Sequence, residues 1–259
     1  MGTISEAIEV KQLDDGCWQA YADPDHQSIT GMYGGWTTSV SLASVLRSST
    51  FDAVPVSLTI NFVATIEPGT TVEIRTTRIG DSRSLEHWSA KVQSGDSLCA
   101  SALIALASRR PSEPHLQPTM PDVPDPSTLD RFKAPGPQGE QAEMYPVDKW
   151  RYGGGDTRSA HWLRDARERP MDRLLLAYLA DQYAPRSFFW GTGVRPSATI
   201  TLSVYFHATD DELAAVGTDF ILNEAVGTRG EQSTSGQQAR LWSRKGDLLA
   251  TTEQLAWYR

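Results

Sequence analysis

The chain carries one pattern twice, and this duplication limits the folds open to it more than any other feature. The segment SLTINFVA at 57–64 alternates polar and apolar residues, and TLSVYFHA at 201–208 repeats the alternation in phase. Later, GDSLCASALIALA at 95–107 corresponds to GDLLATTEQLAWY at 246–258. Alternation with a period of two is typical of half-buried strands, and Gly-Asp indicates a hairpin turn that leads into one. Two matches in the same order, at similar spacing, predict a duplicated unit.

Each copy also has one apolar helical segment ahead of its first matched strand. In the first copy it is WTTSVSLASVLRS, which follows Gly34 and Gly35. In the second it is PMDRLLLAYLADQYA, where Pro170 suits the first turn of a helix. A sheet that covers one apolar helix has to curl around it. Each half is therefore predicted to be a helix followed by long antiparallel strands, which is an α+β arrangement.

A proline-rich segment separates the two copies. Eight prolines fall between Pro111 and Pro137, with almost no apolar periodicity. Proline lacks an N–H donor and has a fixed φ, so this stretch suits neither a helix nor a central strand. We therefore expect a first repeat at 1–110, a linker at 111–150 that lies outside the sheets, and a second repeat at 151–259.

Composition narrows the classes of partner. The chain has 259 residues and a formal net charge of −8, which disfavours a general attraction to nucleic acid or to an anionic membrane. No apolar run approaches the roughly 20 residues that cross a bilayer, and the polar, acidic start MGTISEAIEV differs from a secretory signal. The two cysteines, Cys17 and Cys99, lack metal-ligand spacing. These observations predict a cytoplasmic protein without a metal site, a nucleic-acid partner or a membrane partner.

A Gly-Gly helix followed by a strand pair, all repeated after a linker, resembles the double-hotdog acyl-CoA thioesterase II family over nearly the whole chain. The likeness is sharpest in the second half, in AYLAD at 177–181, ATITLSVYFH at 198–207 and LATTEQLAWYR at 249–259. It implies two antiparallel sheets, each wrapped around a central helix, and an enzyme of fatty acid metabolism that hydrolyses acyl-CoA. It also implies three catalytic residues, which fall on Asp181, Thr199 and Gln254.

These three residue types suit the hydrolysis of a thioester without a cofactor. An aspartate carboxylate can accept a proton from water, while a hydroxyl and an amide hold that water in place. By the sequence match, Gln254 corresponds to Leu103 and Thr199 to Pro55 in the first copy. We therefore expect the second copy alone to carry the site, with the first copy completing the pocket.

Two further pairs of residues are candidates for binding the substrate. Gly34 and Gly35 precede a helix whose free N–H groups could stabilise the thioester oxyanion, as the resemblance implies, although a plain turn would also explain them. Arg78 and Arg83 lie in RTTRIGDSRS, which looks like a family segment near coenzyme A, although exposed hairpin arginines are often only solvated. Arginine suits phosphate because its guanidinium donates two parallel hydrogen bonds.

Several functions compete with acyl-CoA hydrolysis at this level. A non-catalytic acyl-CoA-binding protein would have no need for the carboxylate, hydroxyl and amide set. A hotdog enoyl-CoA hydratase usually has an Asp and His pair at the start of its central helix, and no His stands beside Asp172. A thioesterase acting on acyl-carrier protein also fits the sequence. No Gly-x-Ser-x-Gly motif is present, which argues against an α/β-hydrolase. The resemblance also allows a homodimer or a higher oligomer.

Overall fold

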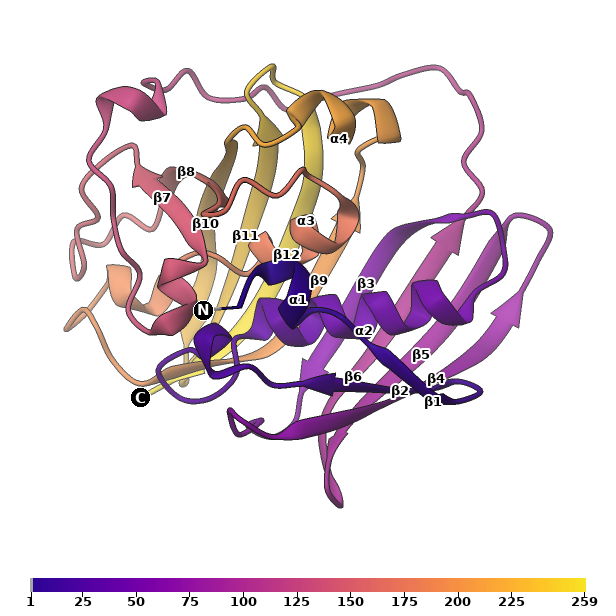
Figure 1. Cartoon of the computed structure of the whole chain (residues 1–259). Helices are drawn as coiled ribbons and strands as arrows, with labels where there is room; N and C mark the ends of the chain where they lie inside the picture. Colours follow the sequence, from indigo (N-terminus) through magenta and orange to yellow (C-terminus); the bar gives the residue numbers. More distant parts are fainter. Residues whose placement is uncertain (1) are drawn as a thin grey trace.

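The computed structural model describes residues 2–259. Its strands form one antiparallel twelve-stranded sheet in the order β1-β2-β4-β5-β6-β3-β9-β12-β11-β10-β8-β7 (Figure 1). The strands of the first half are β1 (Lys11–Asp14), β2 (Cys17–Tyr21), β3 (Val54–Phe62), β4 (Thr71–Asp81), β5 (Leu85–Ser94) and β6 (Ser97–Ala107). Those of the second half are β7 (Ala142–Pro146), β8 (Ser159–Asp165), β9 (Ser197–Phe206), β10 (Ile221–Glu231), β11 (Thr234–Ser243) and β12 (Leu248–Tyr258).

The helices are few and mostly short. The α-helices are α1 (Ile4–Ala7), α2 (Gly34–Ser48), α3 (Arg173–Leu179) and α4 (Asp210–Val216). Single 3₁₀ turns are η1 (Pro24–His26), η2 (Pro126–Thr128), η3 (Pro137–Glu140) and η4 (Arg186–Phe189). In Figure 1, α2 crosses the inner face of the curved sheet. Its side chains from Gly35 to Val45 are all buried, because the helix packs against the sheet and against α3.

The two halves meet edge to edge at β3 and β9, so the two predicted sheets are continuous with each other. Thr59 pairs with Ser203. On either side of this pair, Ser57 pairs with Tyr205 and Asn61 pairs with Thr201, and these two pairs are equivalent by symmetry. Thr59 and Ser203 are corresponding residues of the repeats, and their hydroxyl oxygens lie 2.9 Å apart. This register places a pseudo-twofold axis at that pair. This arrangement of helices and antiparallel strands agrees with the predicted double-hotdog fold of the α+β class.

The second central helix is shorter than its apolar pattern predicts. It begins after Asp172, whose carboxylate accepts a hydrogen bond from the N–H of Leu175 at 2.7 Å, and it ends at Leu179. Residues 180–184 are not helical, and the Gln182 carbonyl accepts from the ring of His161 on β8 at 2.7 Å. The turn after α3 is thereby fixed to the sheet.

The segment predicted as a linker is partly built into the second half. Its first part runs without regular structure from the end of β6 across to the far side of the second half (Figure 1). Met120, Val123 and Leu129 pack against a small cluster that includes Trp162. β7 then pairs with β8 at the edge of the sheet. The prediction that all of 111–150 lies outside the sheets is therefore wrong for β7.

The sequence match between the last strands is wrong by one residue. Gln254 pairs with Leu202, and Leu58, the counterpart of Leu202, pairs with Ile104. Ile104 rather than Leu103 is therefore the structural counterpart of Gln254. The two Gly-Asp turns differ in length, with 95–96 between β5 and β6 but 244–247 between β11 and β12, so aligning them shifts the register. The side chain of Ile104 is buried, and this position of the first half is apolar, as expected.

Candidate functional site

Three polar side chains of the second half meet on the inner face of the sheet. Nε2 of Gln254 donates one hydrogen bond to Oδ1 of Asp181 at 2.7 Å and another to Oγ1 of Thr199 at 2.9 Å. Gln254 is 6% exposed, and Asp181 and Thr199 are partly buried. The structure therefore brings together the three residues that the sequence selected as catalytic candidates.

A β-bulge places Thr199 on this face. Leu255 pairs with Thr201 and Ala256 pairs with Thr199, so Ile200 has no partner on β12. Directly paired residues share a face of the sheet, and Thr199 therefore lies on the same face as Ala256 and Gln254. Without the extra residue, Thr199 would point to the outer face. The first half has a bulge at the matching place, where Pro55 stands instead of threonine.

Asp181 lies against the first half of the chain. An added Cβ at Gly34 would come within 2.5 Å of Oδ2 of Asp181, and the backbone N–H of Gly35 donates to the carboxylate. At Gly35 an added Cβ would meet the carbonyl oxygen of Tyr178 at 2.2 Å. Both glycines are therefore needed for the close approach of α2 to the end of α3. The positive end of the α2 dipole also faces the carboxylate.

Burial changes the acidity of Asp181. Removal from water raises the pKa of this carboxyl to about 7, although the hydrogen bonds from Gln254 and from the Gly35 N–H act in the opposite direction. A carboxyl with this pKa is present in both its protonated and ionised forms near neutral pH. It can therefore take a proton from a ligand and return it.

A second layer of contacts fixes the turn that carries Asp181, and the sequence pattern did not reveal it. Burial lowers the pKa of His161 to about 3, so the ring is neutral and its Nε2–H donates to the carbonyl of Gln182. Arg186 is fully buried and donates to Thr157 O at 2.9 Å and to Ser159 Oγ at 2.7 Å. Together these bonds hold residues 182–186 against the second half of the sheet.

The structure does not bring Arg78 or Arg83 to Asp181. The guanidinium of Arg78 lies 3.3 Å from Glu86, whose other carboxylate oxygen accepts from Ser49 at the end of α2. Arg83 is exposed in the turn between β4 and β5. Gly34 stands at the opposite end of α2, and a helix of 15 residues spans about 22 Å.

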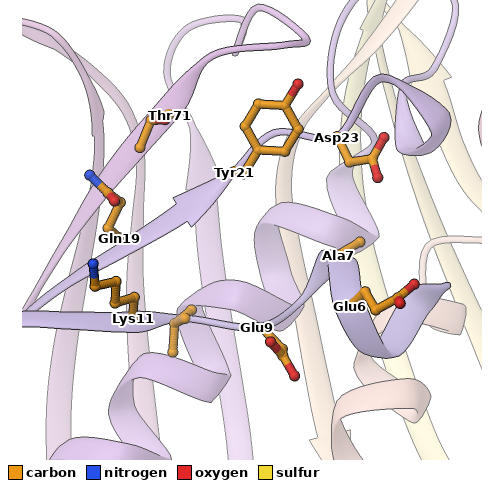
Figure 2. Close-up of a pocket in the computed structure, with 9 residues that line it drawn as sticks. Glu6, Ala7, Glu9, Lys11, Gln19, Tyr21, Asp23 and Thr71 are labelled. Carbon is orange, nitrogen blue, oxygen red and sulfur yellow. The ribbon is translucent and has the colours of Figure 1, made fainter. Parts of the chain in front are cut away.

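A surface pocket of about 400 Å³ lies elsewhere, between α1, β1 and β2 (Figure 2). Its lining includes the carboxylates of Glu6, Glu9 and Asp23 beside a single lysine, Lys11. An anionic ligand such as coenzyme A would be repelled there, and none of the three candidate residues lines this pocket. The geometry of Asp181, Thr199 and Gln254 therefore identifies the site better than cavity size does.

Among residues 2–259 no helix is long and apolar enough to cross a membrane. Over the same range, no three His, Cys, Asp or Glu side chains are grouped so that they could hold a metal ion.

Two family models match almost the whole chain. The model of the acyl-CoA thioesterase N-terminal domain matches residues 22–108, and that of the acyl-CoA thioesterase C-terminal domain matches residues 111–258. The chain belongs to the acyl-CoA thioesterase family. This finding confirms the family resemblance drawn from the sequence, and the protein is accordingly a thioester hydrolase.

Solved structures share the fold over nearly the full chain. A hotdog-fold protein of unknown function from Alicyclobacillus acidocaldarius has 27% identity and a TM-score of 0.92, with 99% of this chain and 97% of that chain covered. The tesB protein of Mycobacterium avium subsp. paratuberculosis has 17% identity and a TM-score of 0.83, with 99% and 98% covered. An acyl-CoA thioesterase II from Mycobacterium marinum has 18% identity and a TM-score of 0.81, with 99% and 98% covered. No curated protein sequence was found to match.

Proposed function

We propose that this enzyme hydrolyses acyl-CoA to a free fatty acid and coenzyme A, with a water molecule activated by Asp181, Thr199 and Gln254. The observation that carries the proposal is the single amide nitrogen of Gln254, which donates to both Asp181 and Thr199. A carboxylate, a hydroxyl and an amide are thus held within reach of one small molecule. A protein that only binds acyl-CoA has no need for a partly buried carboxylate with a pKa of about 7.

In the proposed mechanism, each of the three side chains has a separate role. The two N–H groups of Gln254 are used on Asp181 and Thr199, so the Thr199 hydroxyl keeps its own hydrogen to donate. The ionised carboxylate of Asp181 accepts a proton from water as the water oxygen bonds to the thioester carbon. The carbon–sulfur bond then breaks, and the proton passes from Asp181 to the departing thiolate. The products are a carboxylic acid and a thiol.

The start of α2 supports the developing negative charge in this proposal. The first N–H groups of a helix have no acceptor within the helix, and the helix dipole favours an anion beside them. Gly35 uses its N–H on Asp181, and Gly34 has no side chain that would block a thioester carbonyl. We therefore assign the oxyanion contact to the backbone of Gly34 at the start of α2, while the Gly35 N–H holds Asp181 in place.

The pH dependence of the reaction follows from the acidity of Asp181. A general base acts in its ionised form, so kcat/KM should rise with pH and level off above a pKa of about 7. At pH 5 the rate should be roughly 100-fold below the plateau, because the ionised fraction falls tenfold per pH unit. Initial rates of thiol release from an acyl-CoA, measured from pH 5 to 9, give this profile. A rate that stays flat between pH 5 and 8 would contradict the assignment of Asp181 as the base.

Truncation of the two orienting side chains should give losses that do not add. Gln254→Ala and Thr199→Ala should each lower kcat, and the double variant should lose less than the product of the two, because both groups act on one water. The measurement is a free-thiol assay with a series of acyl-CoA chain lengths.

Gln237→Ala is the matched control for Gln254→Ala. Gln237 is the cross-strand neighbour of Gln254 and is also buried, but its Oε1 accepts from the backbone N–H of Arg186 at 2.9 Å. Its truncation should affect stability more than kcat. Independent, multiplicative losses from Gln254→Ala and Thr199→Ala would show that the two residues do not share a water.

A further inference from the structure

An arginine without a carboxylate partner lies near the site on the second half. Arg195 donates from Nε to the carbonyl of Gly193 at 3.1 Å and from Nη2 to the carbonyl of Trp190. Its guanidinium carbon lies 5.3 Å from the ring centre of Tyr258. Within residues 2–259, no carboxylate lies at ion-pair distance and Nη1 forms no hydrogen bond. One edge of the guanidinium is therefore fixed in place, and the other remains available to an anion.

The loop around Arg195 is shaped to hold that guanidinium. Gly191 and Gly193 have φ of +62° and +84°, and residues other than glycine rarely adopt such positive values. A Cβ added at Gly191 would lie 2.7 Å from Nη2 of Arg195. Trp190 packs edge to face with Tyr258 at 5.9 Å between ring centres. The guanidinium is therefore enclosed by its own loop and by the end of β12.

Arg195 lies on the same side of the sheet as the three candidate catalytic residues. Along β12, Gln254 and Ala256 point inward while Glu253 and Leu255 are exposed, so Tyr258 continues the inner row. From Gln254 to Tyr258 is four residues, which is about 13 Å along a strand. Just before β9, the carbonyl of Pro196 accepts from the N–H of Arg259, so the segment next to Arg195 still lies beside the end of β12.

This separation matches the length of the arm that carries the thioester. About thirteen bonds join the sulfur of coenzyme A to its nearest phosphorus. Four extended residues contain nearly the same number of backbone bonds, so the extended arm reaches about 15 Å. We propose that Arg195 binds the phosphate at the end of the pantetheine arm, while the thioester lies at Gln254. The inference rests on the proposed function, because that function places the thioester. The same phosphate occurs in coenzyme A and in the prosthetic group of acyl-carrier protein.

The surrounding charges favour Arg195 over the arginines that the sequence suggested. In a chain with a net charge of −8, an anion needs a cation that is not already neutralised. Arg78 forms ion pairs with Glu86 and Asp81. Arg83 is exposed in the β4–β5 turn, at the far end of α2 from Asp181. The tyrosine face beneath Arg195 further stabilises its charge without occupying its donors.

The test compares two thioesters that differ by one phosphate. Arg195→Gln should lower kcat/KM for an acyl-4′-phosphopantetheine by about ten- to a hundredfold relative to its effect on the acyl-pantetheine, since one charge-assisted hydrogen-bond pair is lost. The loss should appear as a higher KM. The effect of Arg195→Gln on acyl-CoA, relative to its effect on acyl-pantetheine, should be of the same size. Arg195→Lys, which keeps the charge, should recover part of it. Arg110→Gln, an exposed arginine beyond β6, is the matched control.

Other outcomes would overturn the assignment. Equal effects of Arg195→Gln on both thioesters would mean that the residue supports the loop and not the phosphate. A loss on acyl-CoA without a loss on acyl-4′-phosphopantetheine would place Arg195 at the nucleotide instead. A loss with Arg83→Gln in place of Arg195→Gln would move the phosphate to the β4–β5 turn. In each case Asp181→Asn separately tests the proposed function, because its effect on acyl-pantetheine hydrolysis needs no phosphate.

Discussion

Asp181→Asn should lower kcat by about 10²–10⁴-fold, the usual contribution of a general base. The substitution keeps the shape of the side chain but removes the group that accepts a proton. KM for acyl-CoA should change little, because the proposed phosphate contact at Arg195 does not involve the Asp181 carboxylate. The measurement is steady-state thiol release with an acyl-CoA at saturating concentration. An Asp181→Asn enzyme with undiminished turnover would exclude every mechanism in which this carboxylate takes part.

The control for this variant is Asp172→Asn at the other end of α3. Asp172 caps the helix through the N–H of Leu175, and asparagine caps a helix about as well as aspartate. This substitution makes the same chemical change at the start of α3, at the opposite end of that helix from Asp181, without touching Gln254 or Thr199. Its kcat should stay close to that of the parent enzyme, so a large loss with Asp172→Asn would point to damage to the helix.

Isotope labelling separates the two ways in which Asp181 could act. In the proposed mechanism, water attacks the thioester carbon, and ¹⁸O from labelled water appears only in the released fatty acid. Asp181 could instead attack the carbon itself and form an anhydride with loss of the thiolate. Water that opens this anhydride at the aspartyl carbon would leave ¹⁸O on the enzyme after a single turnover. Mass spectrometry of the peptide that contains Asp181 distinguishes the two results.

The sequence predicted the duplicated fold because alternation of apolar residues survives in both copies. Leu58 and Ile60 face inward with Leu202 and Val204, and the pairing of β3 with β9 brings the corresponding residues of the two copies together. Strand register was harder to predict, since it depends on turn length. The turn before β12 has four residues, whereas the turn before β6 has two. Alignment of their Gly-Asp pairs therefore matches Gln254 to Leu103 instead of Ile104.

The site itself was accessible to sequence analysis only through the family resemblance. Nothing in the alternation of β9 indicates that Thr199 points inward, because the bulge at Ile200 reverses the face. The contact of Asp181 with Gly34 joins residues from different repeats, and no local pattern encodes it. His161 and Arg186 are isolated polar residues in the sequence, and their roles depend on burial.

The same Asp181→Asn variant should be more stable than the parent enzyme at alkaline pH. Burial raises the pKa of this carboxyl in the folded protein to about 7, whereas the unfolded chain has an ordinary value near 3.9. The folded state therefore holds a proton that the unfolded state has lost, and stability falls as pH rises from about 4 to about 7. Asparagine does not titrate, so its advantage over aspartate should grow by about 2–3 kcal/mol between pH 5 and pH 8.

Urea unfolding at pH 5 and pH 8 measures this difference, and a second carboxylate supplies the control. Asp156 is exposed, and hydrogen bonds from Arg158 lower its pKa to about 2. It is ionised in both states from pH 5 upward, so the effect of Asp156→Asn should be the same at the two pH values. If the effect of Asp181→Asn on the free energy of unfolding is also the same at pH 5 and pH 8, burial does not raise the pKa of this carboxyl. If instead the stability difference and kcat/KM both level off near pH 7, one titration accounts for both. The burial that makes Asp181 a useful base then also lowers the stability of the folded enzyme.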